Sequence, residues 1–424
     1  MLILFISYFA VFTFFDIFSF ISFIFILLFV VFFCQGGLFD GFFFFDYVSV
    51  SLLFLSLWVY FFSYIILGGS NLESFLFLFI ILFTVVSFSS DNFVVFYFSF
   101  EFIFLLIFFY LLGWGNTAER LQASFYMLFY TLFFSLPFLL TLLDFFYRGF
   151  SVFFLFGYQI YNGYFWVFLF LVFLVKLPLF GLHSWLPKAH VEAPVSGSML
   201  LAGVLLKLGG YGIIRFFPSI SYFGFSFSFF ISFFFYLSLF GALLVCLFCI
   251  RQIDLKIIIA YSSVVHMSIM LLGLLRESFL GFSGSLLIIV SHGFVSSLLF
   301  FLMTIAYNSF HSRRNIILKG VISIFPTFCL LWFLGCFLNL RIPPFISFFS
   351  EVFILGSLSF LTVLEWFFIF LVCFFTGVYC TYIYISLCHG EYSYFSSFFM
   401  PIKFFLISTF HVYFVLLFPI FFLR

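Results

Sequence analysis

Residues 176–215 read KLPLFGLHSWLPKAHVEAPVSGSMLLAGVLLKLGGYGIIR, and they interrupt a chain that is otherwise strongly apolar. Lys176 and Lys207 lie in this stretch together with three prolines and two histidines, and the flanking sequence is apolar enough to dissolve in lipid. A lysine in the middle of a hydrophobic span costs about 2.5–3.5 kcal/mol on insertion scales. A chain that keeps two such lysines is expected to use them, so this stretch bears on function as well as on fold.

The composition of the whole chain is that of a polytopic membrane protein. Of its 424 residues 67% are hydrophobic and only 7% are charged, whereas a soluble domain covers its surface with far more charge. We attribute the 91 phenylalanines to a bias toward T-rich codons, which is common in organelle genomes and favours mitochondrial encoding. The start, MLILFISYFAVFTFF, has no basic n-region, so we expect no cleavable signal or transit peptide.

Apolar runs of about 20 residues, the length that crosses a bilayer core, predict an all-α protein with fourteen membrane spans. The first span is short, and thirteen crossings are the alternative. The long polar loops that a flavin, iron–sulfur or nucleotide domain would need are missing. The predicted spans are 2–15, 17–34, 47–67, 73–89, 92–113, 121–143, 160–183, 195–217, 228–250, 255–275, 284–306, 319–355 (broken), 360–387 and 402–423.

Lysines and arginines in the connections predict the orientation, because they are enriched on the matrix or cytoplasmic side. Eight lie in the odd-to-even connections and four on the opposite side, so we expect both chain termini on the side away from the matrix or cytoplasm. The first group is Arg120, Lys188, Arg251, Lys256, Arg313, Arg314, Lys319 and Lys403, and the second is Arg148, Arg215, Arg276 and Arg424.

Proline interrupts two of the predicted spans. Pro178 lies two residues after Lys176, and Pro343 and Pro344 precede Glu351 by about two helical turns. Proline removes a backbone hydrogen bond, and at membrane depth the freed carbonyl groups are tolerated only where protein or a water-filled cavity receives them. The two breaks are five spans apart, an odd offset that predicts two inverted halves with a site at the midplane of the membrane.

Few titratable side chains lie inside the predicted spans. Proton transfer through a membrane needs groups that hold or lose a proton near neutral pH, which burial promotes and which histidine does unaided, while water bridges larger gaps. A proton path is therefore predicted. The alternatives are a static ion pair, lysines that snorkel to the interface, and core histidines bonded to serine. The candidates are Glu101, Lys176, Lys207, His266, His292 and Glu351.

Other polar residues favour plainer roles. Arg341 cannot deprotonate, so it either tunes charge near the second break, contacts lipid or a partner, or snorkels. Glu365 is expected at the membrane interface. His183, His190 and Glu192 flank prolines without a further ligand at metal spacing, so we expect helix capping there rather than a metal site.

Two further motifs are not expected to take part in proton transfer or metal binding. HSRR (311–314) is expected to be a solvated or partner-facing loop. Cys246 and Cys249 form a C-x-x-C pair without a second pair or a histidine at metal spacing, and they are expected to be small buried residues.

The stretch at 176–215 closely resembles the central signature of NADH-ubiquinone oxidoreductase chain 4, an antiporter-like subunit of respiratory complex I. Its part PKAHVEAPVSGSMLLAGVLLKLGGYG (187–212) separates chain 4 from the related chains 2 and 5 and from stand-alone cation antiporter subunits. The resemblance covers about residues 90–360, and it continues in FEFIFLLIFFYLLGWG (100–115), RLQASFYMLFYTLFFSLP (120–137), RQIDLKIIIAYSSVVHMSIM (251–270), SHGFVSSLLFFL (291–302), HSRRN (311–315) and NLRIPPFISFFSEVFIL (339–355).

The resemblance implies a proton-translocating subunit of the mitochondrial inner membrane, multi-pass, with both termini on the intermembrane-space side. It implies broken seventh and twelfth helices and two inverted five-helix repeats, at 71–217 and 218–388, between N-terminal helices at 1–70 and a C-terminal helix at 389–424. This chain would bind no cofactor and no metal, whereas FMN, iron–sulfur clusters and ubiquinone would bind to other subunits. Its partners would be the chain 2 and chain 5 neighbours, accessory subunits and lipids such as cardiolipin, and no nucleic acid.

The resemblance also implies roles for the buried groups. Glu101 would pair with Lys176, Lys207 would be the central lysine, His266 and His292 would hold the proton with it, and Glu351 would be the exit group. Arg341 departs from the family, which usually has a small apolar residue there. Two alternatives stay open: a sodium–proton antiporter that uses the same groups, and a structural spacer that needs none of them.

Overall fold

The structure is a computed structural model that describes residues 38–39, 44–67, 71–115, 117–147, 163–220, 225–315, 317–359, 362–390, 405, 407–413 and 415. Nearly all of these residues are helical, and β1 (Leu38–Phe39) pairs antiparallel with β2 (Phe44–Phe45). The predicted spans 2–15 and 17–34 lie outside the described residues, and 402–423 lies largely outside them.

The described helices overlap the predicted spans from 47–67 to 360–387, except for the short helix Trp185–Glu192, which lies in the predicted connection between 160–183 and 195–217. Within the described ranges, nine helical stretches are long and apolar enough to cross a membrane, so the chain is a multi-pass membrane protein. The helices are α3 (Tyr47–Ile66), α4 (Asn71–Ser89), α5 (Phe93–Trp114), α6 (Arg120–Tyr147), α7 (Gly163–Lys176), α8 (Trp185–Glu192), α9 (Val195–Leu200), η2 (Leu201–Leu205), α10 (Leu206–Ile220), α11 (Phe225–Arg251), α12 (Leu255–Leu274), α13 (Phe279–Phe310), η3 (Val321–Ser323), α14 (Pro326–Leu340), α15 (Ile346–Ser357) and α16 (Val363–Cys388).

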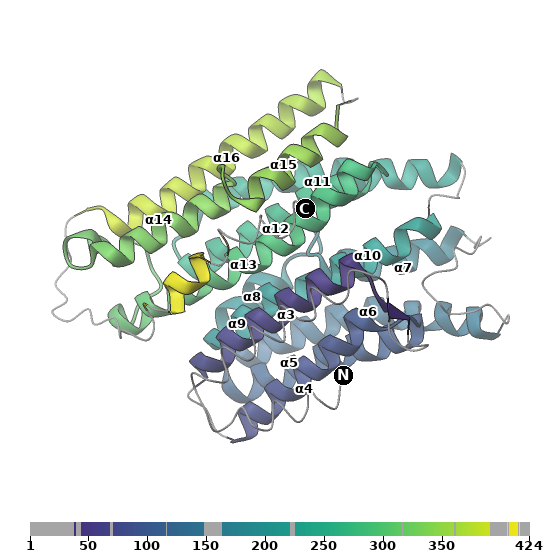
Figure 1. The fold of residues 1–424 in the computed structure, drawn as a ribbon, viewed down its shortest axis with the longest axis horizontal. Helices are drawn as coiled ribbons and strands as arrows, with labels where there is room; N and C mark the ends of the chain where they lie inside the picture. The colour runs from purple at the N-terminus through teal and green to yellow at the C-terminus, as the bar shows by residue number, and fades with distance from the viewer. Residues whose placement is uncertain are drawn as a thin grey trace.

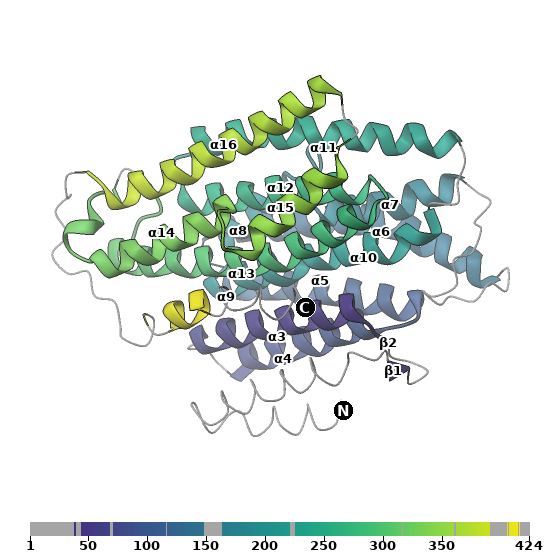
Figure 2. The same cartoon turned by 45° about the horizontal axis from the view of Figure 1, so that its top comes forward.

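The long helices run side by side in layers (Figures 1 and 2). Helices α3, α4 and α5 form one side of the molecule, α11, α14 and α16 form the opposite side, and α8, α9, α12 and α13 lie between them. The central helix α13 touches α3, α9, α10 and η2 on one side and α12, α14 and α15 on the other. It therefore lies between the helix that carries Lys207 and the second broken helix, α14 and α15.

Polar side chains explain where several helices begin. Asp46 and Ser49 form a capping box at the start of α3, and Thr362 and Glu365 form another at the start of α16. Such caps stabilise a helix by about 1 kcal/mol because they satisfy free backbone N–H groups. Burial opposes the charged form of Asp46, but the charge and hydrogen bonds of Arg215, at 2.6 and 2.7 Å, lower the pKa of Asp46 below its usual value.

Both predicted breaks are present in the structure. Helix α7 ends at Lys176 and α8 begins at Trp185, with Pro178 between them, and α14 ends at Leu340 before α15 begins at Ile346. At the first break the indole Nε1 of Trp185 donates a hydrogen bond of 3.1 Å to the carbonyl of Val175. The break is tolerated because protein groups receive its freed carbonyls, as expected at membrane depth.

Glycines allow α10 to lie directly against the first break. A Cβ atom at Gly209 would approach the backbone nitrogen of Leu177 to 3.2 Å, and one at Gly212 would approach the ring of Phe173 to 2.1 Å. The second distance leaves no room for any side chain. The sequence KLGGYG therefore brings the helix that carries Lys207 next to the end of the helix that carries Lys176.

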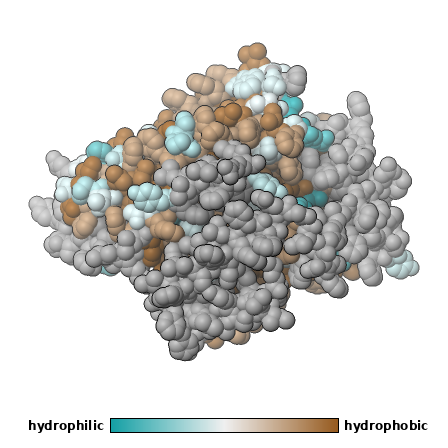
Figure 3. Space-filling model, in the orientation of Figure 1, coloured by the Kyte–Doolittle hydropathy of each residue, from teal (hydrophilic) through white to brown (hydrophobic). Residues whose placement is uncertain are grey.

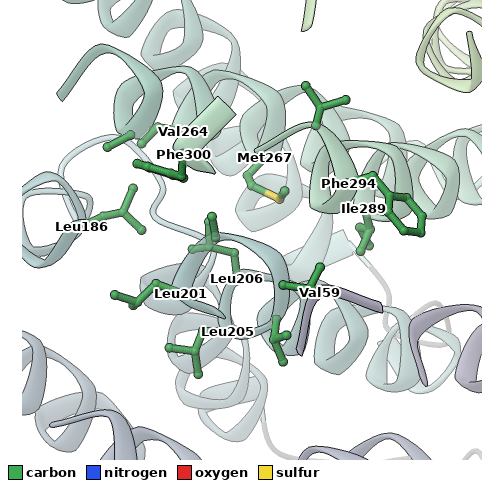
Figure 4. Packing of buried hydrophobic residues seen from close by; sticks show 14 of the residues in the cluster. Val59, Leu186, Leu201, Leu205, Leu206, Val264, Met267, Ile289, Phe294 and Phe300 are labelled. Atoms are coloured by element: carbon green, nitrogen blue, oxygen red, sulfur yellow. The ribbon is translucent and has the colours of Figure 1, made fainter. Parts of the chain in front are cut away.

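A π-helical turn, η2, precedes Lys207 in the chain. Its residues Leu201 and Leu205 are fully buried, and Figure 4 shows them among core side chains that include Val59 of α3 and Ile289 of α13. π-Helical turns are rare and often occur at functional sites. This turn supplies the carbonyl of Ala202, to which the Nζ of Lys207 donates a hydrogen bond.

The outer surface of several helices is apolar. Phe133 on α6 is 73% exposed and Phe370 on α16 is 64% exposed. Figure 3 shows apolar side chains over the face formed by the C-terminal helices. A soluble monomer rarely exposes so large an apolar area, so this surface is suited to lipid or to neighbouring membrane helices.

Candidate functional site

Glu101 and Lys176 form a buried ion pair between α5 and α7. The Lys176 Nζ donates to Glu101 Oε1 at 2.6 Å, and the two side chains are 1% and 13% exposed, in that order. The same ammonium lies 3.0 Å from the ring centroid of Phe100 and 4.0 Å from that of Phe104. A carboxylate and two aromatic faces replace the water that a lysine loses on burial.

A second cluster surrounds Lys207 on α10. Its Nζ donates to the carbonyl of Ala202 in η2 and lies 2.7 Å from Nδ1 of His292 on α13. The ring of His292 faces that of His266 on α12 at a centroid distance of 5.3 Å. Lys207, His292 and His266 are each at most 5% exposed. The structure therefore brings three of the predicted residues into one buried group.

His266 also contacts residues at the second break. Its Nε2 lies 2.7 Å from Oδ1 of Asn339, and its Nδ1 is in contact with Nη2 of Arg341. Arg341 follows α14 directly and is 7% exposed. Its guanidinium therefore faces the interior of the chain, and the alternative that it snorkels to an interface is wrong.

Glu351 on α15 lies at the far end of these contacts. Arg341 Nη1 is 3.4 Å from Glu351 Oε1, and Cys373 Sγ on α16 donates to the same carboxylate at 3.2 Å. A cavity of about 20 Å³ adjoins Glu351 and Cys373, and aliphatic side chains of α11, α12, α15 and α16 form its other walls. A cavity of this volume has room for a water molecule beside the carboxylate.

The six predicted residues thus fall into two groups. In the described part of the chain, no direct hydrogen bond or ion pair joins the Glu101–Lys176 pair to Lys207. The backbone is close, however, because Gly209 approaches the end of α7 at Leu177. The packing of α7 against α10, rather than a side-chain contact, connects the two groups.

The residues around Pro187 and Pro194 do not cap a helix, so that prediction is wrong. The N-cap residue of α9 is Pro194, which has no capping side chain. Glu192 instead accepts a hydrogen bond from Thr117, and His183 Nδ1 accepts one from the backbone N–H of Gly181. His190 is fully buried against Phe300, with a centroid distance of 4.7 Å. His190 and Glu192 are therefore buried, whereas His183 is only partly buried.

The loop HSRR is exposed at His311 and Arg314, as a solvated or partner-facing loop would be, and it also bonds to other parts of the chain. Arg313 donates to the carbonyl of Val191 at 3.0 Å, and the backbone of Arg314 bridges to that of Asp254. Lys256 Nζ donates to the carbonyl of Ala193 at 3.3 Å. Arg313 of the loop and Lys256 of the first turn of α12 thus bind carbonyls at the C-terminal end of α8.

Two other expectations concern cysteine and metal chemistry. Cys246 and Cys249 on α11 are buried free thiols, as predicted. Among the residues that the structure describes, no three or more His, Cys, Asp or Glu side chains are grouped so as to hold a metal ion.

Asn339 and His411 were not singled out from the sequence. Asn339 stands two residues before Arg341 in an apolar run, a signal that resembles those of the predicted residues. His411 Nδ1 accepts a hydrogen bond of 3.2 Å from the indole of Trp58, and its Nε2 donates to the carbonyl of Phe294 at 2.9 Å. His411 therefore attaches the C-terminal segment to α3 and α13.

Comparison with known proteins gives consistent matches. Residues 90–379 match a family model described as "NADH:quinone oxidoreductase/Mrp antiporter, TM". NADH-ubiquinone oxidoreductase chain 4 of Locusta migratoria is 42% identical over 287 residues, which are 67% of this chain and 64% of that protein. Chain 4 of Aedes aegypti is 41% identical over 290 residues, which are 67% of this chain and 63% of that protein. The chain thus covers less than two thirds of the length of these relatives.

Two further comparisons cover more of the chain. Chain 4 of Rhipicephalus sanguineus is 34% identical over 366 residues, 83% of this chain and 82% of that protein. One chain of the respiratory complex I of Thermus thermophilus with bound NADH has the same fold, with a TM-score of 0.81 and 21% identity over 95% of this chain and 90% of that one. From the family match and these relatives, the chain belongs to the NADH:quinone oxidoreductase/Mrp antiporter family of membrane proteins.

Proposed function

We propose that the chain is the chain 4-type subunit of a mitochondrial NADH:ubiquinone oxidoreductase and that it carries protons across the inner membrane. The observation that carries the proposal is the buried series of contacts from Lys207 through His292 and His266 to Arg341 and Glu351. A spacer between other subunits would need no such series, because each buried charge costs free energy unless it is paired.

The proposed mechanism depends on electrostatic interactions between the buried titratable groups. Electron transfer in other subunits changes the charge state of the Glu101–Lys176 pair through a neighbouring membrane subunit. A positive charge on Lys176 repels a proton on Lys207, and pairing with Glu101 reduces that repulsion. A proton held by Lys207, His292 and His266 then leaves past Glu351, where the adjoining cavity has room for water.

The architecture is proposed to follow the same family. The chain would have fourteen membrane helices, with two inverted five-helix repeats at 71–217 and 218–388, N-terminal helices at 1–70 and a C-terminal helix at 389–424. Both termini would face the intermembrane space. Its neighbours would be the chain 2 and chain 5 subunits, accessory subunits and cardiolipin, while FMN, iron–sulfur clusters and ubiquinone would bind elsewhere in the complex.

Replacing Lys207 by methionine tests the proposal. Methionine keeps the length of the side chain and removes the charge, so we expect normal assembly and loss of proton translocation through this chain. The number of protons moved per NADH oxidised, measured with the complex in sealed vesicles, should fall. An unchanged ratio would contradict the proposed function, and transport that requires a sodium gradient would favour the antiporter alternative.

A further inference from the structure

Arg341 lies between two members of the proposed proton path and contacts both. Its Nη2 touches Nδ1 of His266, and its Nη1 lies 3.4 Å from Oε1 of Glu351. A guanidinium has five N–H donors, no acceptor and a charge that it does not lose in proteins. Neither contact can therefore pass a proton, and the arginine separates the two groups that it touches.

The contact with Arg341 fixes the protonation of His266. Because the guanidinium only donates, Nδ1 of His266 must be the acceptor. Nε2 therefore carries the hydrogen and donates it to Oδ1 of Asn339 at 2.7 Å. The amide nitrogen of Asn339 faces Sγ of Cys380 at 3.4 Å, which agrees with this orientation of the amide. With both ring nitrogens occupied, His266 is neutral and has no free position for a proton.

We propose that Arg341 is a gate between His266 and Glu351, an inference that rests on the proposed function. In the position observed, the arginine blocks proton uptake at Nδ1 of His266. Moving fully onto Glu351 would free that nitrogen. The ion pair at 3.4 Å is longer than the 2.7–2.9 Å typical of a charge-assisted hydrogen bond, so a small side-chain movement is enough.

Charge on Glu351 determines the position of the gate. An ionised Glu351 attracts the guanidinium and leaves His266 open to a proton from the side of His292. When that proton passes from Nδ1 of His266 to a carboxylate oxygen of Glu351, directly or through water, the carboxylic acid loses its attraction for the arginine. Arg341 then returns to His266 while Glu351 releases the proton outward. The path is thus open to one side at a time, which prevents backward flow.

The backbone at Arg341 supports a role for its side chain. Its φ of 60° lies in the left-handed region that favours glycine, and it ends α14 in this conformation. Glycine would adopt the same backbone without strain. An arginine kept in an unfavourable conformation, buried and in contact with two titratable groups, points to a function of the guanidinium.

Four variants of the whole complex in sealed vesicles test the gate: Arg341→Gly, Arg341→Gln, Arg341→Lys and Arg251→Gln. Two quantities are measured, the protons moved per NADH oxidised and the passive proton conductance under an imposed membrane potential. Without the gate, we expect the protons moved per NADH oxidised to fall and the passive proton conductance to rise in Arg341→Gly and Arg341→Gln. Lysine is also a cation that only donates hydrogen bonds, so Arg341→Lys should bring both quantities part of the way back to their wild-type values. Arg251→Gln is the control, because it removes an exposed arginine at the end of α11.

The outcomes separate the gate from the proposed function. If Arg341→Gly keeps the wild-type ratio and conductance while Lys207→Met lowers the ratio, the gate is wrong and the proposed function stands. If the ratio falls without a rise in conductance, or lysine restores nothing, the gate is also wrong. If Lys207→Met leaves the ratio unchanged, the proposed function itself fails. If the Arg341→Gly variant does not assemble, the gate is tested by comparing Arg341→Lys with Arg341→Gln in the same two measurements.

Discussion

The buried charge of Lys176 lies where it has specific partners. Lys176 has the carboxylate of Glu101 on one side and the ring faces of Phe100 and Phe104 on the other. Breaking a buried pair is destabilising, because the remaining charge has neither water nor a partner. The pair is therefore both a structural link between α5 and α7 and, in the proposed mechanism, the first charge to change.

The stability costs of removing Glu101 and Lys176 one at a time should add up to more than the cost of removing both together. We expect Glu101→Ala or Lys176→Ala to lower the free energy of unfolding by about 3–5 kcal/mol each, and the double variant to cost less than their sum. Thermal unfolding of the detergent-solubilised protein measures all three, with Val95→Ala on the exposed side of α5 as the control. Costs that simply add would mean that the two charges act independently.

The energetic cost of burying a charge identifies the titratable residues of the candidate site from the sequence. It does not predict which side chains those residues contact. His266 lies 73 residues before Asn339 and 75 before Arg341, and hydropathy says nothing about which histidine faces which break. For this reason the sequence alone does not decide the role of Arg341. Its contacts with His266 and Glu351 depend on the packing of α12 against the second break.

At the scale of helices, the apolar runs predicted the ends of α3, α4, α5, α11, α12 and α16 within about three residues, whereas α7 ends at Lys176 rather than 183 and α8 lies in a predicted connection. Proline alone was a weaker guide. Pro178 lies in a break, whereas Pro137 lies inside the continuous helix α6. The difference is local: Trp185 folds back to bind the carbonyl of Val175, and no sequence pattern indicates that contact. The π-helical turn and the contacts of Gly209 and Gly212 likewise depend on packing between distant helices.

Two glycine substitutions should have opposite effects on stability. A methyl group at Gly212 would overlap the ring of Phe173, so Gly212→Ala should destabilise the protein by about 1–3 kcal/mol. Gly113, near the end of α5, has open space at its Cβ position, so Gly113→Ala should stabilise by up to about 1 kcal/mol through helix propensity. Melting temperatures of the two variants in the same detergent compare them. A tolerated Gly212→Ala would show that α7 and α10 have room to separate.

At the scale of the whole molecule, an apolar exterior surrounds a core that is itself mainly apolar and encloses a smaller set of buried polar side chains, whereas a soluble protein covers its core with charge. Composition alone predicted this class of protein. The arrangement of the two halves was less accessible, because α13 contacts the helices around both breaks and such contacts leave no period in the sequence. The offset between the two proline breaks predicts inverted halves, and the resemblance to a family supplies the expectation that each half is a five-helix repeat.

The apolar exterior predicts how membrane insertion responds to charge. Phe133 lies at the middle of α6 and is 73% exposed, so Phe133→Arg should disfavour insertion by about 2.5–3.5 kcal/mol. Tyr147, at the end of the same helix and 91% exposed, is the matched control, because an arginine there reaches the interface. Insertion efficiency in microsomal membranes measures both. Equal insertion of the two variants would mean that Phe133 does not lie at membrane depth.

The π-helical turn Leu201–Leu205 contains one residue more than an α-helical turn would, because a π turn closes over five residues where an α turn closes over four. Five residues of a π turn cover about the same rotation as four residues of an α turn, so the helix on either side of the turn keeps its direction. Losing one residue within Leu201–Leu205 would therefore restore an ordinary turn and leave Lys207 directed toward His292. Losing one residue from the regular helix before the turn would instead rotate Lys207 by about 100° away from His292. The turn is thus the place in this helix where a change of length can be absorbed.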